Sequence, residues 1–165
     1  MQRLPAAADI LALVPISGAD GGNDTVVHTA AGGRLTLHAA TEYVLICLAG
    51  REDKELRLIR RSAARQLARR RNIILPILHG CVLTPVMVRP VDARRGTLGY
   101  INIARPPLVA DGVHTGTDVA LQSGAVIHSL WQPPTVQKLM REAKALHYKL
   151  LLDVRRQLLV AEEFA

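Results

Sequence analysis

The sequence predicts an α+β fold with a mainly antiparallel sheet, a basic amphipathic helix in the middle of the chain and a long helix near its C-terminal end. Three observations lead to this prediction. Two pairs of branched apolar segments flank short turns, the apolar residues change to a helical period after Glu52, and a second helical stripe follows Thr135. The 165 residues, of which 49% are hydrophobic and 21% charged, suffice for one core, so we expect residues 1–165 to form a single domain.

The first part of the chain is expected to be rich in strands. Residues 10–16, ILALVPI, form an apolar run that ends in the small and turn residues SGADGGND, which predicts a strand. The segments TVVHT and RLTLHA flank AAGG, which is the pattern of a hairpin. Residues 42–50, EYVLICLAG, could form a buried strand or the first turns of a helix, because periodicity does not separate the two over so short a run.

A basic amphipathic helix is predicted from Glu52 to about Asn72, where branched apolar residues and a proline return. Its apolar residues fall on one side of a helical wheel, and arginines repeat at four-residue spacing on the other. The apolar side comprises Leu56, Ile59, Ala63 and Leu67, and the other side Arg57, Arg61, Arg65 and Arg69. Acidic residues at the start and arginines at the end would complement the helix dipole. These residues are Glu52, Asp53, Glu55, Arg69, Arg70 and Arg71.

The chain beyond this helix is expected to return to strands. IILPILHGCVLTPVMVR predicts two extended segments joined at His79 and Gly80, with Pro76 and Pro85 at edge positions or bulges. GYINI predicts a short strand, and RPPLVADGVHTG an irregular connection. TDVALQSGAVIHSL predicts a hairpin that turns at its Ser-Gly pair.

The last predicted element is a long helix that Thr135 caps and that runs to about residue 161. We expect its basic face to be solvated, and its apolar face to pack on the sheet or to pair with a second copy of the chain. The apolar face comprises Val136, Leu139, Ala143, Leu146, Leu150 and Val154. The basic face comprises Lys138, Arg141, Lys144, Lys149, Arg155 and Arg156.

The arginine run ELRLIRRSAARQLARRRN, residues 55–72, raises the main question about function. It contains seven arginines and one acid, Glu55, and this excess accounts for nearly all of the net charge of +7. Like charges three or four residues apart repel along a helix, so the arginines need partners. Planar guanidinium groups suit phosphate oxygens and a narrow minor groove. The run indicates a phosphate-binding face, and the alternatives are a solvated face or a contact with protein or lipid.

The sequence lacks the local signatures of common enzymes. It contains no GxGxxG, P-loop, HExxH or GxSxG motif, so we expect no catalytic residues. His79 and Cys81 have no second ligand pair at metal spacing, so neither a metal nor a cofactor is expected. Cys47 and Cys81 lie in apolar runs, which is typical of reduced thiols in a cytoplasmic protein. No apolar run approaches the roughly 20 residues that span a bilayer, so we expect no membrane contact.

Two stretches together resemble the competence transcription factor (ComK) family. They are NIILPILHGCVLTPVMVRPVDARRGTLGYINI and TDVALQSGAVIHSLWQPPTVQKLMREAKAL. In the first stretch, the similarity lies in an arginine-rich segment that precedes a Leu-Pro-Ile strand, and in a Gly-Tyr-Ile strand. In the second stretch, it lies in a V-x-L-x-S-G-x-x-I hairpin and in the last helix, which contains a Gln and an Ala-x-x-Leu motif. In the hairpin and the last helix the matching residues are Val119, Leu121, Ser123, Gly124, Ile127, Gln137, Ala143 and Leu146. The resemblance spans roughly residues 11–150.

The resemblance implies a transcriptional activator that binds AT-rich double-stranded DNA largely from the minor groove and assembles as dimers. A family run with an aromatic pair and serines appears here only as CLAGR, in which Cys47, Gly50 and Arg51 match. We predict a DNA-binding regulator that dimerises through the C-terminal helix, and the alternative is a non-catalytic adaptor for an acidic protein. The predicted DNA-contacting residues are Arg51, Arg57, Arg60, Arg61, Arg65, Arg69, Arg70, Arg71, Arg89, Arg94 and Arg95.

Overall fold

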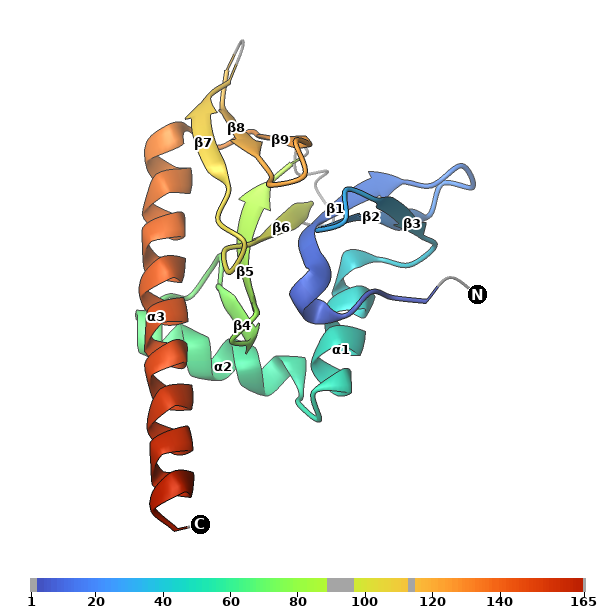
Figure 1. The fold of residues 1–165 in the computed structure, drawn as a ribbon. Coiled ribbons are helices and arrows are strands. Elements are labelled where there is room, and N and C mark those ends of the chain that lie inside the picture. Colours follow the sequence, from blue (N-terminus) through green and yellow to red (C-terminus); the bar gives the residue numbers. More distant parts are fainter. Residues whose placement is uncertain (1–2, 89–96, 113–114, 165) are drawn as a thin grey trace.

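The computed structural model describes residues 3–88, 97–112 and 115–164, and these residues form three layers (Figure 1). Within them, the middle layer is a six-stranded antiparallel sheet in the order β3-β2-β1-β6-β5-β4. Its strands are β1 (Ile10–Ser17), β2 (Asn23–Thr29), β3 (Arg34–Leu37), β4 (Leu75–Leu78), β5 (Cys81–Met87) and β6 (Leu98–Asn102). The predicted α+β fold with a mainly antiparallel sheet is confirmed.

Two helices cover one face of this sheet (Figure 1). Ile10 and Leu13 of β1 pack in one apolar cluster with Leu45 and Leu56 of the helices. A bulge after Ile10 places both strand residues on this face, although they are three positions apart. The helices are α1 (Thr41–Arg51) and α2 (Leu56–Leu67).

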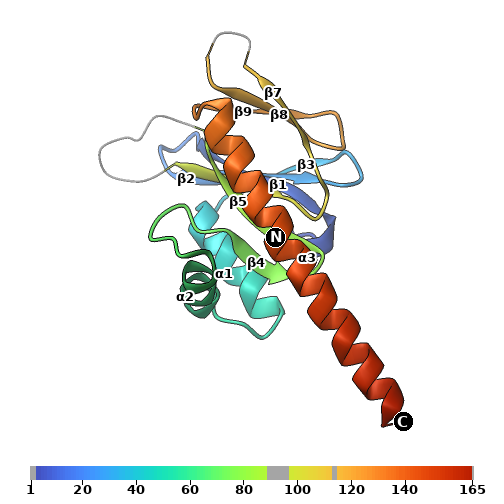
Figure 2. The same ribbon diagram turned by 90° about the vertical axis from the view of Figure 1, so that its left-hand side faces the viewer.

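A long helix and a small sheet cover the opposite face (Figure 2). Leu11 of β1 and Ile101 of β6 pack there with Leu139 of the helix and Val119 of the small sheet. The ring of His147, on the same helix, donates a hydrogen bond to the backbone carbonyl of His79, with 2.8 Å between the two atoms. The helix is α3 (Pro133–Glu163), and the small antiparallel sheet joins β7 (Leu108–Asp111), β8 (Thr117–Ala120) and β9 (Val126–Ser129) in that order.

A buried asparagine, Asn102, ties three segments of the middle sheet together. Its Oδ1 accepts hydrogen bonds from the backbone N–H groups of Val82 and Ala104, each at 3.0 Å. Its Nδ2 donates to the carbonyls of Ile10, at 2.8 Å, and Gly80, at 3.1 Å. Every hydrogen-bonding position of the amide is therefore used, which makes a fully buried polar side chain compatible with the core.

The predicted hairpins are all present. Strands β2 and β3 pair as a hairpin, as do β4 and β5, and β8 and β9. Pro76 lies at a register shift in β4, an edge strand, as expected for a residue without an N–H group. The same expectation is wrong for Pro85, which pairs in regular register with Tyr100 in β5, between β4 and β6. Gly124 has a φ of 89° in the turn between β8 and β9, a conformation that glycine adopts at low cost.

Other predictions need correction or are decided by the structure. EYVLICLAG, which the sequence left open, forms a helix. The predicted irregular connection contains β7, which pairs with β8 from Leu108 to Asp111. Helix α3 begins at Pro133, and Thr135 does not cap it, because a proline at the first helical position already fits the required backbone angle. Among the described residues, no helix is long and apolar enough to cross a bilayer.

Candidate functional site

Helix α2 presents a basic face to solvent because its apolar residues anchor it to the sheet. Leu56 and Ala63 are buried, and Ile59 and Leu67 pack partly buried against the two core clusters. Just before the helix, Nζ of Lys54 donates to the carbonyl of Ile77 on β4, at 2.6 Å. The predicted division into an apolar and an arginine side is confirmed for residues 56–67.

The predicted ends of this helix are wrong. Glu52 caps the end of α1, and Asp53 has a φ of 55°, so the chain turns before α2 begins. At the other end Ala68 is left-handed, with a φ of 51°, which stops the helix before Arg69. No acidic residue lies in its first turn. The helix dipole therefore favours Arg65, which lies in the last turn, but not Arg57, which lies in the first.

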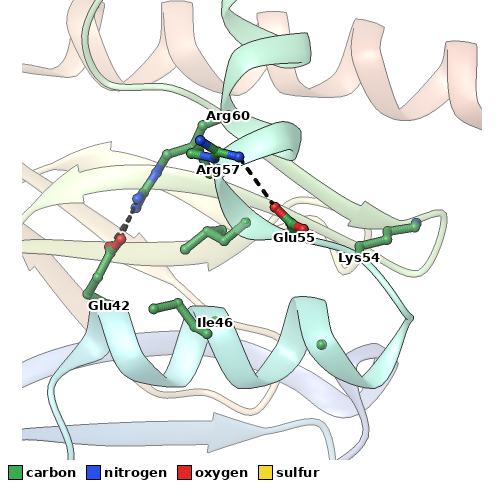
Figure 3. A pocket seen from close by; sticks show the side chains of 8 residues that line it. Glu42, Ile46, Lys54, Glu55, Arg57 and Arg60 are labelled. Carbon is green, nitrogen blue, oxygen red and sulfur yellow. Dashed lines mark hydrogen bonds and ion pairs between the residues drawn. The ribbon is translucent and has the colours of Figure 1, made fainter.

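The partly exposed guanidinium of Arg60 is paired with an acid of the same chain. One of its terminal nitrogens, Nη2, donates to Oε2 of Glu42 on α1 at 2.6 Å, and Nη1 donates to the other carboxylate oxygen (Figure 3). The guanidinium of Arg60 also lies close enough to Tyr100 of β6 to interact with it electrostatically. The hydrogen bond from Arg60 holds the pKa of Glu42 below its ordinary value, and the same bond raises the pKa of Arg60. This half-buried arginine joins α2 to α1 and to the sheet.

Arg69 has a similar internal role at the other end. Its Nη1 donates to Oε2 of Glu142 on α3 at 2.7 Å, and its side chain is only 22% exposed. The pair links the segment after α2 to the long helix. Both acidic partners come from other helices, which the spacing of charges within the arginine run could not reveal.

The remaining arginines of the run are exposed. Arg57, Arg61 and Arg65 follow one another at four-residue spacing along α2, and Arg70 and Arg71 lie in the turn beyond it. Arg57 is within 3.7 Å of Glu55, but both side chains are mostly exposed. Within the part of the chain that the structure describes, Arg61, Arg65, Arg70 and Arg71 have no side-chain hydrogen bond or ion pair. We call these five residues the arginine face: Arg57, Arg61, Arg65, Arg70 and Arg71.

The predicted supporting arginines do not all join this face. Arg51 ends α1, and its Nη1 donates to the carbonyl of Pro5 at 2.9 Å, which ties α1 to the N-terminal segment. Arg89, Arg94 and Arg95 lie outside the described residues.

A pocket of about 400 Å³ lies between α1 and α2, beside the arginine face (Figure 3). Its lining is largely apolar, and the ion pairs Glu42–Arg60 and Glu55–Arg57 border it. Tyr43, Ile46 and Leu58 are 61%, 50% and 46% exposed on the same two helices. The sequence did not predict this pocket, because it depends on EYVLICLAG being a helix. Its lining residues are Glu42, Ile46, Gly50, Lys54, Glu55, Leu56, Arg57 and Arg60.

The thiols and possible metal ligands offer no comparable site. Cys81 is buried, and burial raises the pKa of its thiol to about 12, so it stays protonated. Cys47 is half-buried in α1, and neither cysteine forms a disulfide. Among the residues that the structure describes, no three His, Cys, Asp or Glu side chains gather to hold a metal ion.

Comparisons of the chain with family models, with curated proteins and with solved structures found no match. Function is therefore inferred from the residues and their geometry. The features that stand out are the exposed arginine face, of which only Arg57 has an acidic residue nearby among the described residues, and the pocket next to it.

Proposed function

We propose that the protein binds double-stranded DNA through the arginine face, as a non-catalytic transcriptional regulator. The observation that supports this most strongly is the row Arg57, Arg61 and Arg65 on the exposed side of α2. Arg57 has only the exposed Glu55 nearby, at 3.7 Å, and Arg61 and Arg65 have no acidic partner among the described residues. Their guanidinium groups repel one another, and phosphate oxygens would relieve that repulsion through bidentate hydrogen bonds.

The dimensions of the arginine face suit a nucleic-acid groove. Successive arginines of the row are about 6 Å apart along the helix axis, and the twelve residues of α2 are about 18 Å long. A helix of this size can lie in the major groove, or across the narrower minor groove with only its arginine side chains reaching in, and Arg70 and Arg71 extend the positive charge past its end. A narrow, AT-rich minor groove attracts arginine most strongly, so we propose AT-rich sites.

The two internal ion pairs support this role because they fix the helix that carries the arginine face. Arg60 holds α2 to α1 through Glu42, and Arg69 holds the following turn to α3 through Glu142. Because the helix is already ordered before binding, less conformational entropy is lost when its arginines bind a ligand. The resemblance to competence transcription factors also supports DNA binding. On that basis we propose that the protein is cytoplasmic and activates transcription.

A second candidate function is an adaptor that binds an acidic protein, and the pocket is the observation that favours it. Ile46 and Leu58 are half exposed beside the cationic row, so an amphipathic segment with apolar and acidic side chains could use both features. DNA would make little use of exposed leucine and isoleucine side chains. This candidate would be favoured if the chain formed a complex with another protein, if that complex dissociated at high salt, and if duplex DNA did not bind.

Fluorescence anisotropy with AT-rich duplex, GC-rich duplex and single-stranded DNA, each at two salt concentrations, tests the proposal. We expect AT-rich duplex to bind most tightly and to retain its preference at the higher salt concentration, because groove contacts add to phosphate contacts. Equal binding of all three nucleic acids would exclude a sequence-specific regulator. It would show that the arginine face binds nucleic acid without specificity. No binding at low salt would overturn the proposal.

A further inference from the structure

The turn that follows α2 brings the arginine face to the side of α3 (Figure 2). Ala68 and Asn72 are both left-handed, with φ angles of 51° and 52°, so the chain changes direction at either end of this turn. Between them, Arg69 pairs with Glu142 of α3 at 2.7 Å. Its Nε also donates to the backbone carbonyl of Arg71, at 3.4 Å. Arg71, the last residue of the arginine face, therefore contacts a residue that is itself bonded to α3.

Two cations of α3 flank this link. Lys138 precedes Glu142 by four residues, which places the two about one turn apart on the same side of the helix. Arg141 is the residue immediately before Glu142. Both cations are exposed, and within the described part of the chain neither has a side-chain hydrogen bond or ion pair. We call Lys138 and Arg141 the α3 cations.

The Arg69–Glu142 pair leaves the α3 cations without an acid to neutralise them. Glu142 is the one acidic residue three or four positions from Lys138, and Arg69 already binds it. Arg141 has no acidic residue at that spacing, and Lys138 and Lys144 lie three positions to either side of it. Like charges at that spacing repel along a helix. Positive charge thus continues from the arginine face across the turn onto α3.

We propose that the DNA site extends across this turn onto α3, where the α3 cations contact the phosphate backbone. This inference rests on the proposed function, because it lengthens the same site. The sequence predicted a solvated basic face for α3, and the link to the arginine face is the reason to assign two of its cations another role. Phosphate contacts, which lysine and arginine both make, position a duplex without reading its bases. The α3 cations therefore add affinity, and sequence preference stays with the arginines of α2.

Fluorescence anisotropy of Lys138→Gln/Arg141→Gln with AT-rich and GC-rich duplex, over a series of salt concentrations, tests the extended site. We expect binding of both duplexes to weaken alike, by about three- to tenfold, because phosphate contacts carry no sequence information. The salt slope should become shallower by about 1–2. Circular dichroism should still show a folded protein, since both side chains are exposed and glutamine keeps the helix propensity.

Lys144→Gln/Lys149→Gln is the matched control, because it removes two charges from the same helix. Lys144 lies about 200° around the helix from Glu142, on the opposite side, and Lys149 has Asp153 four residues after it. We expect affinity and salt slope to change little in this control. Equal weakening by both variants would show that only the total charge of α3 matters, and would overturn the extended site.

Three further outcomes distinguish failure of the extended site from failure of the proposed function. If Arg61→Gln/Arg65→Gln weakens binding and Lys138→Gln/Arg141→Gln does not, DNA contacts α2 alone and only the extension is overturned. If the wild-type chain binds no duplex, both proposals are overturned. Titration of wild type well above the dissociation constant should bind no more than one duplex per chain. Two duplexes per chain would mean that the arginine face and the α3 cations form separate sites, which would contradict a continuous one.

Discussion

Arg60 of α2 donates hydrogen bonds to both carboxylate oxygens of Glu42 on α1, eighteen residues earlier in the chain. This pair separates the arginines of residues 55–72 by role. Arg60 and Arg69 pair with acids of neighbouring helices and hold α2 in place. The arginine face remains exposed, and the proposal of DNA binding concerns only that second set.

We predict that Arg60→Gln lowers stability and weakens DNA binding only slightly, since Arg60 helps to fix α2 but is not part of the arginine face. The variant loses the bidentate pair with Glu42, which is partly exposed, so the free energy of unfolding should fall by about 0.5–1 kcal/mol. Urea denaturation measures this change, and anisotropy measures affinity for AT-rich duplex, which should stay within about twofold of wild type. A loss of affinity as large as that of an arginine-face variant would place Arg60 in the interface.

The Glu42–Arg60 pair should also make stability depend on pH. Arg60 lowers the pKa of Glu42 below its ordinary value of 4.5, so the pair contributes its full stability above that pH. This contribution is lost as the pH falls through the lowered pKa of the folded protein. The stability difference between wild type and Arg60→Gln should therefore be constant near neutral pH and shrink under acidic conditions. Urea denaturation of both proteins across acidic pH measures it, and a difference that grows on acidification would contradict this assignment.

Substitution of Asn102 should lower the stability of the protein more than most single substitutions do. Asn102→Ala removes four hydrogen bonds. It leaves buried backbone groups of Val82 and Ile10, and part-buried ones of Ala104 and Gly80, without that partner, so we expect a loss of about 3 kcal/mol or more. Thermal and urea denaturation measure the loss. Asn23→Ala, at the exposed start of β2, is the matched control and should change stability by less than about 0.5 kcal/mol. A small effect at Asn102 would show that water replaces its hydrogen bonds.

Ala68→Gly should stabilise the protein. Ala68 ends α2 with a φ of 51°, a left-handed conformation that costs an L-amino acid roughly 1 kcal/mol and glycine almost nothing. We expect a net gain of about 0.5–1 kcal/mol in urea denaturation, since glycine also loses more entropy on folding. Ala64→Gly, inside the same helix, should instead lower stability by about 1 kcal/mol. Destabilisation by both substitutions would mean that α2 does not end at Ala68.

The elements that the sequence predicted correctly are those with local signals. The hairpins follow from branched segments around short turns, and the apolar side of α2 follows from the spacing of Leu56 and Ala63. Helix α1 was left open because an apolar run of nine residues suits a buried strand equally well. The ends of α2 were missed because positive φ angles at Asp53 and Ala68, residues other than glycine, leave no clear trace in the sequence.

The candidate site was only partly predictable for a related reason. The arginine row at residues 57, 61 and 65 is a local pattern, and the structure places it on one exposed side of α2. The partners of Arg60 and Arg69 come from residues 18 and 73 positions away, so their roles depend on tertiary packing. The pocket likewise arises only when α1 and α2 pack side by side.

The central claim, that the arginine face binds DNA, is tested most directly by the salt dependence of affinity for AT-rich duplex. Wild type is compared with Arg61→Gln/Arg65→Gln, and with Lys144→Gln/Lys149→Gln on α3 as a control that removes the same charge. The proposal predicts weaker binding for the first variant and a salt slope shallower by about 1–2, with little change for the control. Unchanged affinity and slope in Arg61→Gln/Arg65→Gln would contradict it and remove α2 from the interface.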